Sequence, residues 1–266
     1  VLDREIQSLV NKEPFTIYLP QFNHSLFQIL ASHFLCENSV LVEEGITAYK
    51  LDKALYTNTK TGFVQFLSSI FTKRFILKNN HYHPYPLTKF KYAITLSEDG
   101  FPFIEMKKVI LINREAIADY INIIVDEDLV FVLDSFKERA MISDEEYFTI
   151  IEETLNLLKS HKRRLLVKFH PEQNEVIREK TLNFISNSFK FENVVYLNDS
   201  CILELEFLKS KNLIVIGMHT SLLYYANKFG HNVLSSIKIT SRYPKINNYI
   251  NHIMDREQRK RYMSYE

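Results

Sequence analysis

Three short stretches of the sequence place chemically active side chains directly after apolar runs: LVEEG (41–45), LVKFHPEQ (166–173) and IVIGMHTSLL (214–223). A carboxylate can take the proton from an attacking hydroxyl. A histidine beside a phosphate can be cationic and can stabilise or protonate that phosphate as it leaves. A helix that starts with Thr and Ser offers N–H groups to the same anion. Together these groups suit transfer of a group from a phosphate leaving group.

Each stretch also has a simpler interpretation. His170 can be a polar residue at a strand end, with Pro171 stopping the strand because proline lacks an N–H. Glu43 and Glu44 can be a solvated pair at a strand-to-turn junction. Thr220 can simply cap a helix, although capping and phosphate binding use the same helix end and are compatible.

The second half of the chain alternates apolar strands with helices. We expect strands at 128–135, 164–170, 194–198, 212–217 and 232–237, and helices at 143–161, 175–189, 202–210 and 220–230. Ser143 and Glu146 form a capping-box pattern, and Gly230 is placed to end the last of these helices. This alternation predicts a parallel sheet with right-handed crossovers, a Rossmann-like domain.

The first half is less regular. We expect strands at 15–20, 39–45 and 109–113 and an amphipathic helix at 21–34, whereas 73–92 is basic and aromatic with no clean period. A helical, charged tail is expected from Tyr243 onward. The acidic segment near 125–128 suggests a boundary, which gives an N-terminal domain at 1–127 and a C-terminal domain at 128–266. Two α/β halves of this kind resemble the GT-B architecture, in which two Rossmann-like domains face a central cleft.

Composition excludes several classes of protein. The chain has 5 glycines and contains neither GxGxxG nor GxxxxGK[ST], which argues against dinucleotide and P-loop chemistry. Its net charge of +1 gives no basic field for a nucleic-acid partner. The two cysteines, Cys36 and Cys201, make no disulfide framework, so a reducing compartment is expected. No apolar run reaches the roughly 18 residues that span a membrane.

The three stretches, in this order along the chain, resemble the bacterial sialyltransferases of GT-B type. The similarity is greatest to the group of lipooligosaccharide sialyltransferases and capsular polysialyltransferases, whose pattern is two acids and a glycine, then His-Pro, then a Ser/Thr motif. It extends from about residue 15 to the end of the second Rossmann-like domain. Two features depart from the pattern: the acidic motif is EEG rather than DDG, and the third motif reads HTS rather than SS.

The resemblance implies a role for each matching residue. Glu43 would be the general base, with Glu44 and Gly45 beside it as substrate contacts. His170 would act at the phosphate of the donor CMP-sialic acid, and Pro171 would shape the nucleotide pocket. The phosphate-binding residues at the third strand end would be Gly217, His219, Thr220 and Ser221. In this set His219 or Thr220 would take the role that a serine has in the family. Glu204 would bind the ribose hydroxyls, with Glu206 as the fallback.

Other polar residues have two readings. Asn23 and His24 follow a strand and either contact a substrate or begin the next helix, with Asn23 as its cap. His81 and His83 have the spacing of a metal pair, but no third ligand is nearby, so we expect a loop and no metal site. The basic aromatic stretch around them either faces an anionic membrane or glycan or is a solvated loop.

We therefore expect an inverting sialyltransferase without cofactor or metal. It would use a CMP-sugar donor and a glycan acceptor of the bacterial surface, lipopolysaccharide, lipooligosaccharide or capsule, in the cytoplasm or peripherally on the cytoplasmic face of the inner membrane. A variant would use another CMP-activated nonulosonic acid or Kdo. A different class would be a non-catalytic GT-B-like subunit of capsule assembly. A complete N-terminal domain should have further strand–helix units before Phe15, so we expect it to be truncated.

Overall fold

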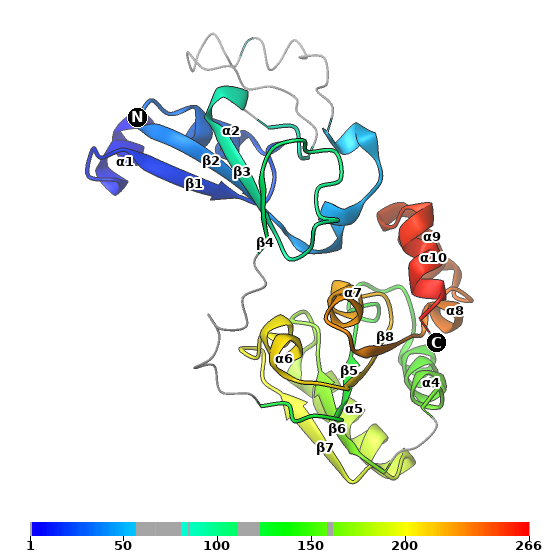
Figure 1. Cartoon of the computed structure of the whole chain (residues 1–266). Helices are drawn as coiled ribbons and strands as arrows, with labels where there is room; N and C mark the ends of the chain where they lie inside the picture. The colour runs from blue at the N-terminus through cyan, green and yellow to red at the C-terminus, as the bar shows by residue number, and fades with distance from the viewer. Residues whose placement is uncertain are drawn as a thin grey trace. The chain divides into compact units, whose positions relative to one another are not determined.

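The computed structural model describes residues 2–56, 67, 81–84, 86–110, 123–158 and 162–265 (Figure 1). The chain divides into two compact units, Val1–Ile112 and Asn113–Glu266. Both units contain a sheet in which every strand pair is parallel. The predicted class, mixed α/β with parallel sheets, is confirmed.

Within the described part of the first unit, the sheet has four strands in chain order, β1-β2-β3-β4. Its strands and helices are α1 (Leu2–Leu9), β1 (Phe15–Leu19), α2 (Ser25–Ser32), β2 (Cys36–Val42), β3 (Phe90–Thr95) and β4 (Lys108–Ile110). The described residues of this unit also form the short 3-10 helices η1 (Gly45–Tyr49), η2 (Lys53–Tyr56) and η3 (Leu87–Lys89). The strand β3 was not predicted, and the end of the predicted strand 109–113 lies outside the described residues.

The sheet of the second unit has five strands in the order β7-β6-β5-β8-β9. Its elements are β5 (Leu129–Val132), α4 (Asp144–Leu155), β6 (Arg164–Lys168), α5 (Glu175–Ser188), β7 (Asn193–Leu197), α6 (Leu203–Lys209), β8 (Ile214–Gly217), α7 (Ser221–Lys228), β9 (Asn232–Ser235), α8 (Ile237–Thr240), α9 (Pro244–Ile253) and α10 (Arg256–Met263). Numbered from its first strand, this is the order 3-2-1-4-5 of a Rossmann-like sheet, and the winding direction reverses between β5 and β8.

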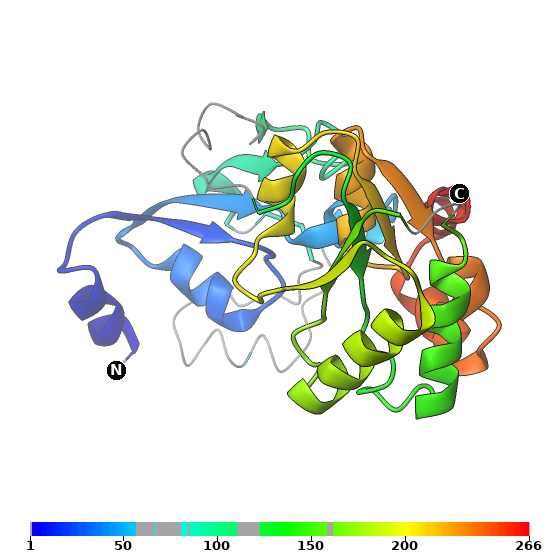
Figure 2. The same cartoon turned by 90° about the horizontal axis from the view of Figure 1, so that it is seen from below.

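Helices cover both faces of this second sheet. The helices α6 and α7 pack together on one face, and α4 and α5 pack together on the other (Figure 2). The central strand β5 is therefore buried along its whole length, as expected for a parallel strand with helices on both sides. The predicted capping box of Ser143 and Glu146 begins α4, and Gly230, with φ of +90°, follows α7.

Residues 123–127, which the sequence pattern assigned to the first domain, pack on the second unit. The carboxylate of Glu206 in α6 accepts hydrogen bonds from the backbone N–H groups of Ile123 and Ile124, each 3.0 Å long. The N–H of Glu127 donates to the carbonyl of Lys211. These bonds fix the approach of the chain to β5.

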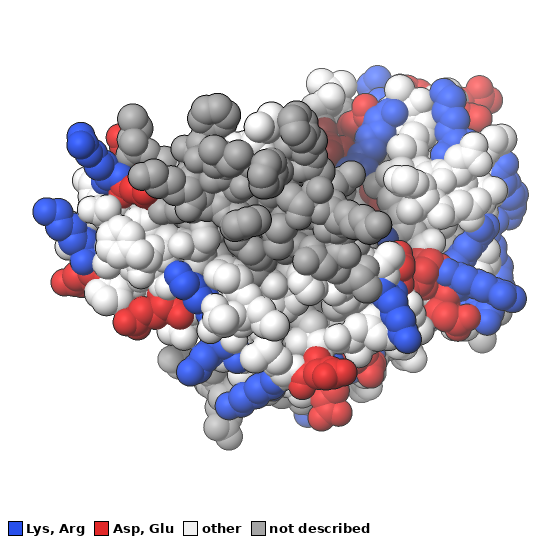
Figure 3. Space-filling view, turned by 90° about the horizontal axis from the view of Figure 1, so that it is seen from above, with Lys and Arg blue, Asp and Glu red and all other residues white. Residues whose placement is uncertain are grey.

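The described surface is mixed in charge. Lys and Arg side chains lie among Asp and Glu side chains over the described part of the face in Figure 3, in agreement with the net charge of +1. Within the described ranges, none of the helices combines the length and the apolar character that crossing a membrane requires.

Candidate functional site

The carboxyl ends of the central strands in the second unit bring three titratable side chains into one row. Val132 of β5 pairs with Lys168 of β6 on one side and with Gly217 of β8 on the other. Asp134, His170 and His219 each stand two residues beyond this paired row. Strand register therefore aligns an acid between two histidines at the edge where parallel α/β sheets bind ligands.

Asp134 and His219 form a buried ion pair across the point where the strand order reverses. The distance from Oδ2 of Asp134 to Nδ1 of His219 is 2.7 Å, and the two side chains are 9% and 6% exposed. The ring of Phe136 stacks on the imidazole of His219 at 4.9 Å between centroids, and the ring of Tyr249 meets it edge-on at 5.6 Å. These contacts fix the plane of the imidazole.

The environment of Asp134 favours its ionised form. Burial would by itself raise the pKa of Asp134. The contact with His219 and the N–H of Ser135, which donates to Oδ1 at 2.8 Å, outweigh burial, and the pKa of Asp134 lies below its usual value.

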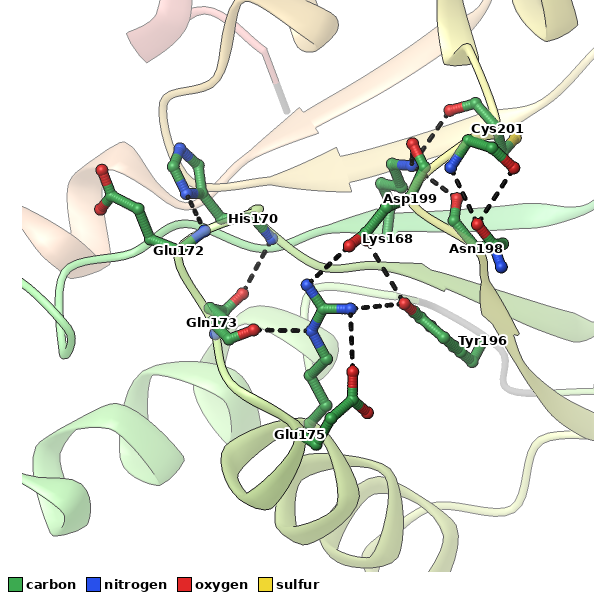
Figure 4. Close-up of polar contacts among 11 residues, drawn as sticks. Lys168, His170, Glu172, Gln173, Glu175, Tyr196, Asn198, Asp199 and Cys201 are labelled. Carbon is green, nitrogen blue, oxygen red and sulfur yellow. Dashed lines mark hydrogen bonds and ion pairs between the residues drawn. The ribbon is translucent and has the colours of Figure 1, made fainter.

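The loop after β6 fixes the orientation of His170. The backbone N–H of Glu172 donates to Nδ1 of His170 at 3.2 Å, and the backbone N–H of His170 donates to the side-chain carbonyl of Gln173 at 2.9 Å. Figure 4 shows the ring pointing away from the hydrogen bonds around Gln173. Because Nδ1 accepts a hydrogen bond, the proton of the neutral ring lies on Nε2. Pro171 is exposed beside it.

Two carboxylates that the sequence pattern did not indicate, Glu138 and Glu172, lie within electrostatic range of His170, and Arg139 binds the second of them. The guanidinium of Arg139 binds Glu172 through Nε at 3.0 Å and Nη2 at 3.2 Å, and its Nη1 donates to the hydroxyl of Tyr249 at 2.6 Å. Burial raises the pKa of Glu138, although the charges of Lys137 and His170 oppose it. The Oε2 atom of Glu138 is buried and has no hydrogen-bond partner among the described residues.

Lys168, at the end of β6, organises the neighbouring loop between β7 and α6. Its Nζ donates to the backbone carbonyls of Asn198 at 2.7 Å, Asp199 at 3.1 Å and Cys201 at 3.0 Å (Figure 4). Burial lowers the pKa of Lys168, and the nearby Cys201, Asp199 and Glu204 oppose this effect. The loop leads directly into α6, which carries Glu204.

The two glutamates proposed for the ribose differ in burial. Glu204 is half-buried in the first turn of α6, within electrostatic range of Lys168. Glu206 is fully buried, and its Oε2 accepts the two backbone bonds from residues 123 and 124. Glu206 therefore stabilises the chain before β5, and its full burial favours Glu204 as the residue proposed for the ribose.

The third motif forms a tight strand-to-helix turn. A Cβ atom on Gly217 would lie 2.9 Å from the carbonyl oxygen of Val132, so this position has no room for a side chain. Thr220 is the N-cap of α7, and its Oγ1 accepts from the N–H of Leu222 at 3.3 Å. Ser221, half-buried, is the first residue of the helix. The hydroxyl of Tyr262 donates to the carbonyl of Thr220 at 2.7 Å and ties the turn to α10.

The acidic motif of the first unit lies directly after β2. Oε2 of Glu43 accepts from the hydroxyl of Tyr49 at 2.7 Å and from the backbone N–H of Leu96 at 2.8 Å. Glu44 is exposed, and Gly45 has φ of +64°, a left-handed conformation that favours glycine. The motif thus has one carboxylate that is anchored at a strand end and one that faces solvent.

Asn23 and His24 differ in their contacts, and only one of them begins the helix α2. His24, not Asn23, is the N-cap of α2, and its Nδ1 accepts from the N–H of Leu26 at 3.3 Å. The side-chain nitrogen of Asn23 lies 3.0 Å from Nδ1 of His81. Burial lowers the pKa of His81, Lys50 adds to that effect and Glu44 opposes it. Asn23 therefore belongs to a polar group at the carboxyl edge of the first sheet.

The described residues contain no group of three His, Cys, Asp or Glu side chains that could bind a metal ion. His83 instead lies 3.1 Å from the carbonyl of Tyr56 through its Nδ1. Residues 73–80 and 85 of the basic aromatic stretch 73–92 lie outside the described residues, and the expected contact of this stretch with a membrane or glycan stays a prediction.

The structure brings the sequence-indicated residues together as two sets, one in each unit. His170, Gly217, His219 and Thr220 share the edge of the second sheet, and Glu43 and Asn23 lie at strand ends of the first. Sequence reasoning missed Asp134 and Glu138. The sequence signal for Asp134 was its position, since DS (134–135) follows the apolar strand as HP follows the next one.

Comparison with known proteins supplies a family. No curated protein matches the chain. Residues 2–238 match the model of the family alpha-2,8-polysialyltransferase (POLYST). The matched range takes in the described strands of both sheets and every residue that the sequence indicated for the site. The match confirms the polysialyltransferase part of the resemblance, and the chain belongs to the alpha-2,8-polysialyltransferase family.

Proposed function

We propose that the chain moves sialic acid from CMP-sialic acid to a hydroxyl of a glycan acceptor, with inversion at the anomeric centre and without a metal. The family match supports the reaction class. The observation that carries the donor side is the row of Asp134, His170 and His219 beside the start of α7. Ligands of open α/β sheets bind at this edge, where the strand order reverses.

The donor would bind to the second unit. The phosphate would meet His170, His219 and the turn of Thr220 and Ser221, where helix N–H groups and hydroxyls favour an anion. Gly217 would let the chain approach closely, and Pro171 would shape the nucleotide pocket. Glu204 would accept hydrogen bonds from the ribose. It lies in the first turn of α6, directly after the loop whose carbonyls Lys168 binds.

The acceptor would bind to the first unit, with Glu43 as general base. Tyr49 and Leu96 fix the Glu43 carboxylate at a strand end, as a base that must meet one hydroxyl requires. Glu44, Gly45 and Asn23 would be substrate contacts. In this proposal the two units take the GT-B arrangement, so that both sets of residues serve one active site.

The reaction is a single displacement. The acceptor hydroxyl gives its proton to the Glu43 carboxylate, and its oxygen forms the new bond to the anomeric carbon of the sialic acid. The bond from that carbon to the phosphate oxygen breaks, and its electron pair stays on the departing CMP. The phosphate gains one negative charge, which the cationic and N–H groups of the second unit would stabilise.

The family name points to the acceptor. An alpha-2,8-polysialyltransferase extends a chain of sialic acid, and we propose this acceptor as part of a bacterial surface glycan. Another CMP-activated acid sugar would use the same phosphate and ribose contacts. Peripheral attachment to the cytoplasmic face of the inner membrane stays a prediction from the sequence.

Isothermal titration with CMP, UMP and UDP in the presence of EDTA tests the donor site. We expect binding of CMP in preference to both controls, unaffected by the chelator. His170→Ala should weaken CMP binding, whereas His252→Ala, which removes an exposed histidine from α9 of the same unit, should not. Equal binding of UDP, or equal affinity in both variants, would contradict the proposed donor site.

A further inference from the structure

We infer that the pair of Asp134 and His219 supplies the cation at the donor phosphate, with Asp134 as a positioning residue that keeps His219 protonated and its Nε2–H directed at the phosphate. His170 acts there as a neutral hydrogen-bond donor. The inference rests on the proposed function and deepens it, because it assigns different electrostatic roles to two histidines of the same strand edge.

The geometry of His219 leaves one nitrogen for a ligand. Its Nδ1 contacts Asp134 at 2.7 Å. Nδ1 is buried and its polar contact among the described residues is this ion pair, whereas no hydrogen bond to Nε2 is found there. Phe136 and Tyr249 fix the ring plane, so Asp134 decides the direction of Nε2. An acid that orients one ring nitrogen and sets the protonation of the other is a general device of histidine sites.

His170 has the opposite constraint. Its Nδ1 accepts the backbone N–H of Glu172, and an imidazolium has no lone pair with which to accept that bond. Protonation of His170 would therefore break the contact that fixes the loop after β6. The neutral ring, with its proton on Nε2, keeps the contact and still donates one hydrogen bond to a phosphate oxygen.

Other charges around the pair are consistent with a cation at His219. Arg139 lies within electrostatic range of Asp134, but it is already bound to Glu172 and to the hydroxyl of Tyr249. Asp134 is the carboxylate in direct contact with His219, and its pKa lies below the usual value. An ionised Asp134 stabilises the imidazolium of its partner.

Histidine-selective ¹⁵N NMR of the ligand-free protein tests the pairing. At pH 7 we expect both ring nitrogens of His219 to be protonated and His170 to be neutral with its proton on Nε2, the signals being assigned with His219→Gln and His170→Gln. In Asp134→Asn, His219 should lose its proton at lower pH than in the wild type. A neutral His219 in the wild type, with its proton on Nδ1, would overturn the inference because Nε2 could not donate.

CMP titration of the same proteins between pH 5.5 and 8.5 tests the link to the phosphate. The ratio of Kd values for Asp134→Asn and wild type at each pH cancels the ionisation of CMP itself. We expect Asp134→Asn to weaken binding about tenfold or more at pH 7, the range for loss of a hydrogen bond to a charged group, and less at pH 5.5, where His219 is protonated again. A ratio that does not change with pH would give Asp134 a structural role only.

Asp128→Asn is the matched control. Asp128 precedes β5 at the opposite end of the strand, is buried, and forms an ion pair with Arg164. Its substitution should cost stability without altering the NMR signals of His219 or the affinity for CMP. If Asp134→Asn does not fold, His219→Gln provides the affinity test, and unchanged binding there overturns the inference. If the wild type binds no CMP, the proposed function fails and the phosphate role fails with it, while the NMR spectrum still decides the state of His219.

Discussion

Glu43 and Glu44 are identical in type and adjacent in sequence, yet only one is built into the fold. Two donors meet Oε2 of Glu43, one from η1 and one from the end of β3, whereas Glu44 is exposed. A general base must be within hydrogen-bond reach of one proton in a fixed geometry. At the scale of single residues, fixed orientation therefore favours Glu43 over Glu44 as the proposed base.

Glu43→Gln should lose this base and keep nucleotide binding, because the amide preserves the shape of the side chain but cannot take a proton. We expect turnover to fall by about two to four orders of magnitude, the range for general-base catalysis, with unchanged affinity for CMP. Single-turnover kinetics and calorimetry measure the two quantities. Glu37→Gln, an exposed carboxylate earlier in β2, is the control. Near-normal transfer by Glu43→Gln would remove it from the reaction.

Asp134 gives a second prediction at this scale, on stability against pH. Its pKa in the folded chain lies below the usual value because His219 and the N–H of Ser135 outweigh burial. Its contribution to stability is thus present above the ordinary pKa of about 3.9 and is lost as pH falls through the lowered one. In urea unfolding from pH 6 downward, the free energy of unfolding should fall less steeply with decreasing pH for Asp134→Asn than for wild type. Equal slopes would contradict the assigned environment.

At the scale of elements, strand ends and the loops that follow them build the site. The β7–α6 loop has a buried anchor, since Lys168 donates to three of its carbonyls and is itself only 9% exposed. A lysine at the end of a strand resembles a catalytic group in sequence. Its three bonds to the backbone show a structural role, which places the loop that leads to Glu204.

Lys168→Met should leave three backbone carbonyls without their donor. We expect the free energy of unfolding to fall by about 2–4 kcal/mol, since each buried acceptor that loses its partner costs about 1–3 kcal/mol and the loop relaxes in part. CMP affinity should fall as well, through the displaced loop. Lys180→Met, on the exposed surface of α5, is the control for the loss of a lysine. Unchanged affinity in a destabilised Lys168→Met would separate this loop from the nucleotide site.

The elements also show what the sequence could predict. Buried strands alternating with helices, and the capping box of Ser143 and Glu146, predicted the second unit because both signals are local. The strand β3 was missed because its first three residues belong to the basic aromatic stretch 73–92, which has no clean period. Asp134 was missed for a different reason. Its partner is 85 positions away at His219 (219 minus 134), and only the register of β5 with β8 brings the two together.

At the scale of the whole molecule, the two units place their candidate site residues in the same way. Each unit is a parallel sheet whose carboxyl edge carries the polar side chains, and the strand order of the second unit reverses between β5 and β8, where Asp134 meets His219. In the proposed enzyme the first unit activates a hydroxyl and the second binds a nucleotide phosphate. The family match extends over residues 2–238 and so takes in the sheets of both units.

The most direct test of this account is a transfer assay with CMP-sialic acid and a fluorescent α-2,8-linked oligosialic acid primer, in the presence of EDTA. The account predicts that the wild-type chain lengthens the primer and releases one CMP for each residue added, and that Glu43→Gln binds CMP but does not extend the primer. Two results would contradict this account. One is a wild-type chain that binds CMP but does not lengthen the sialylated primer, and the other is a Glu43→Gln variant that extends the primer at the wild-type rate.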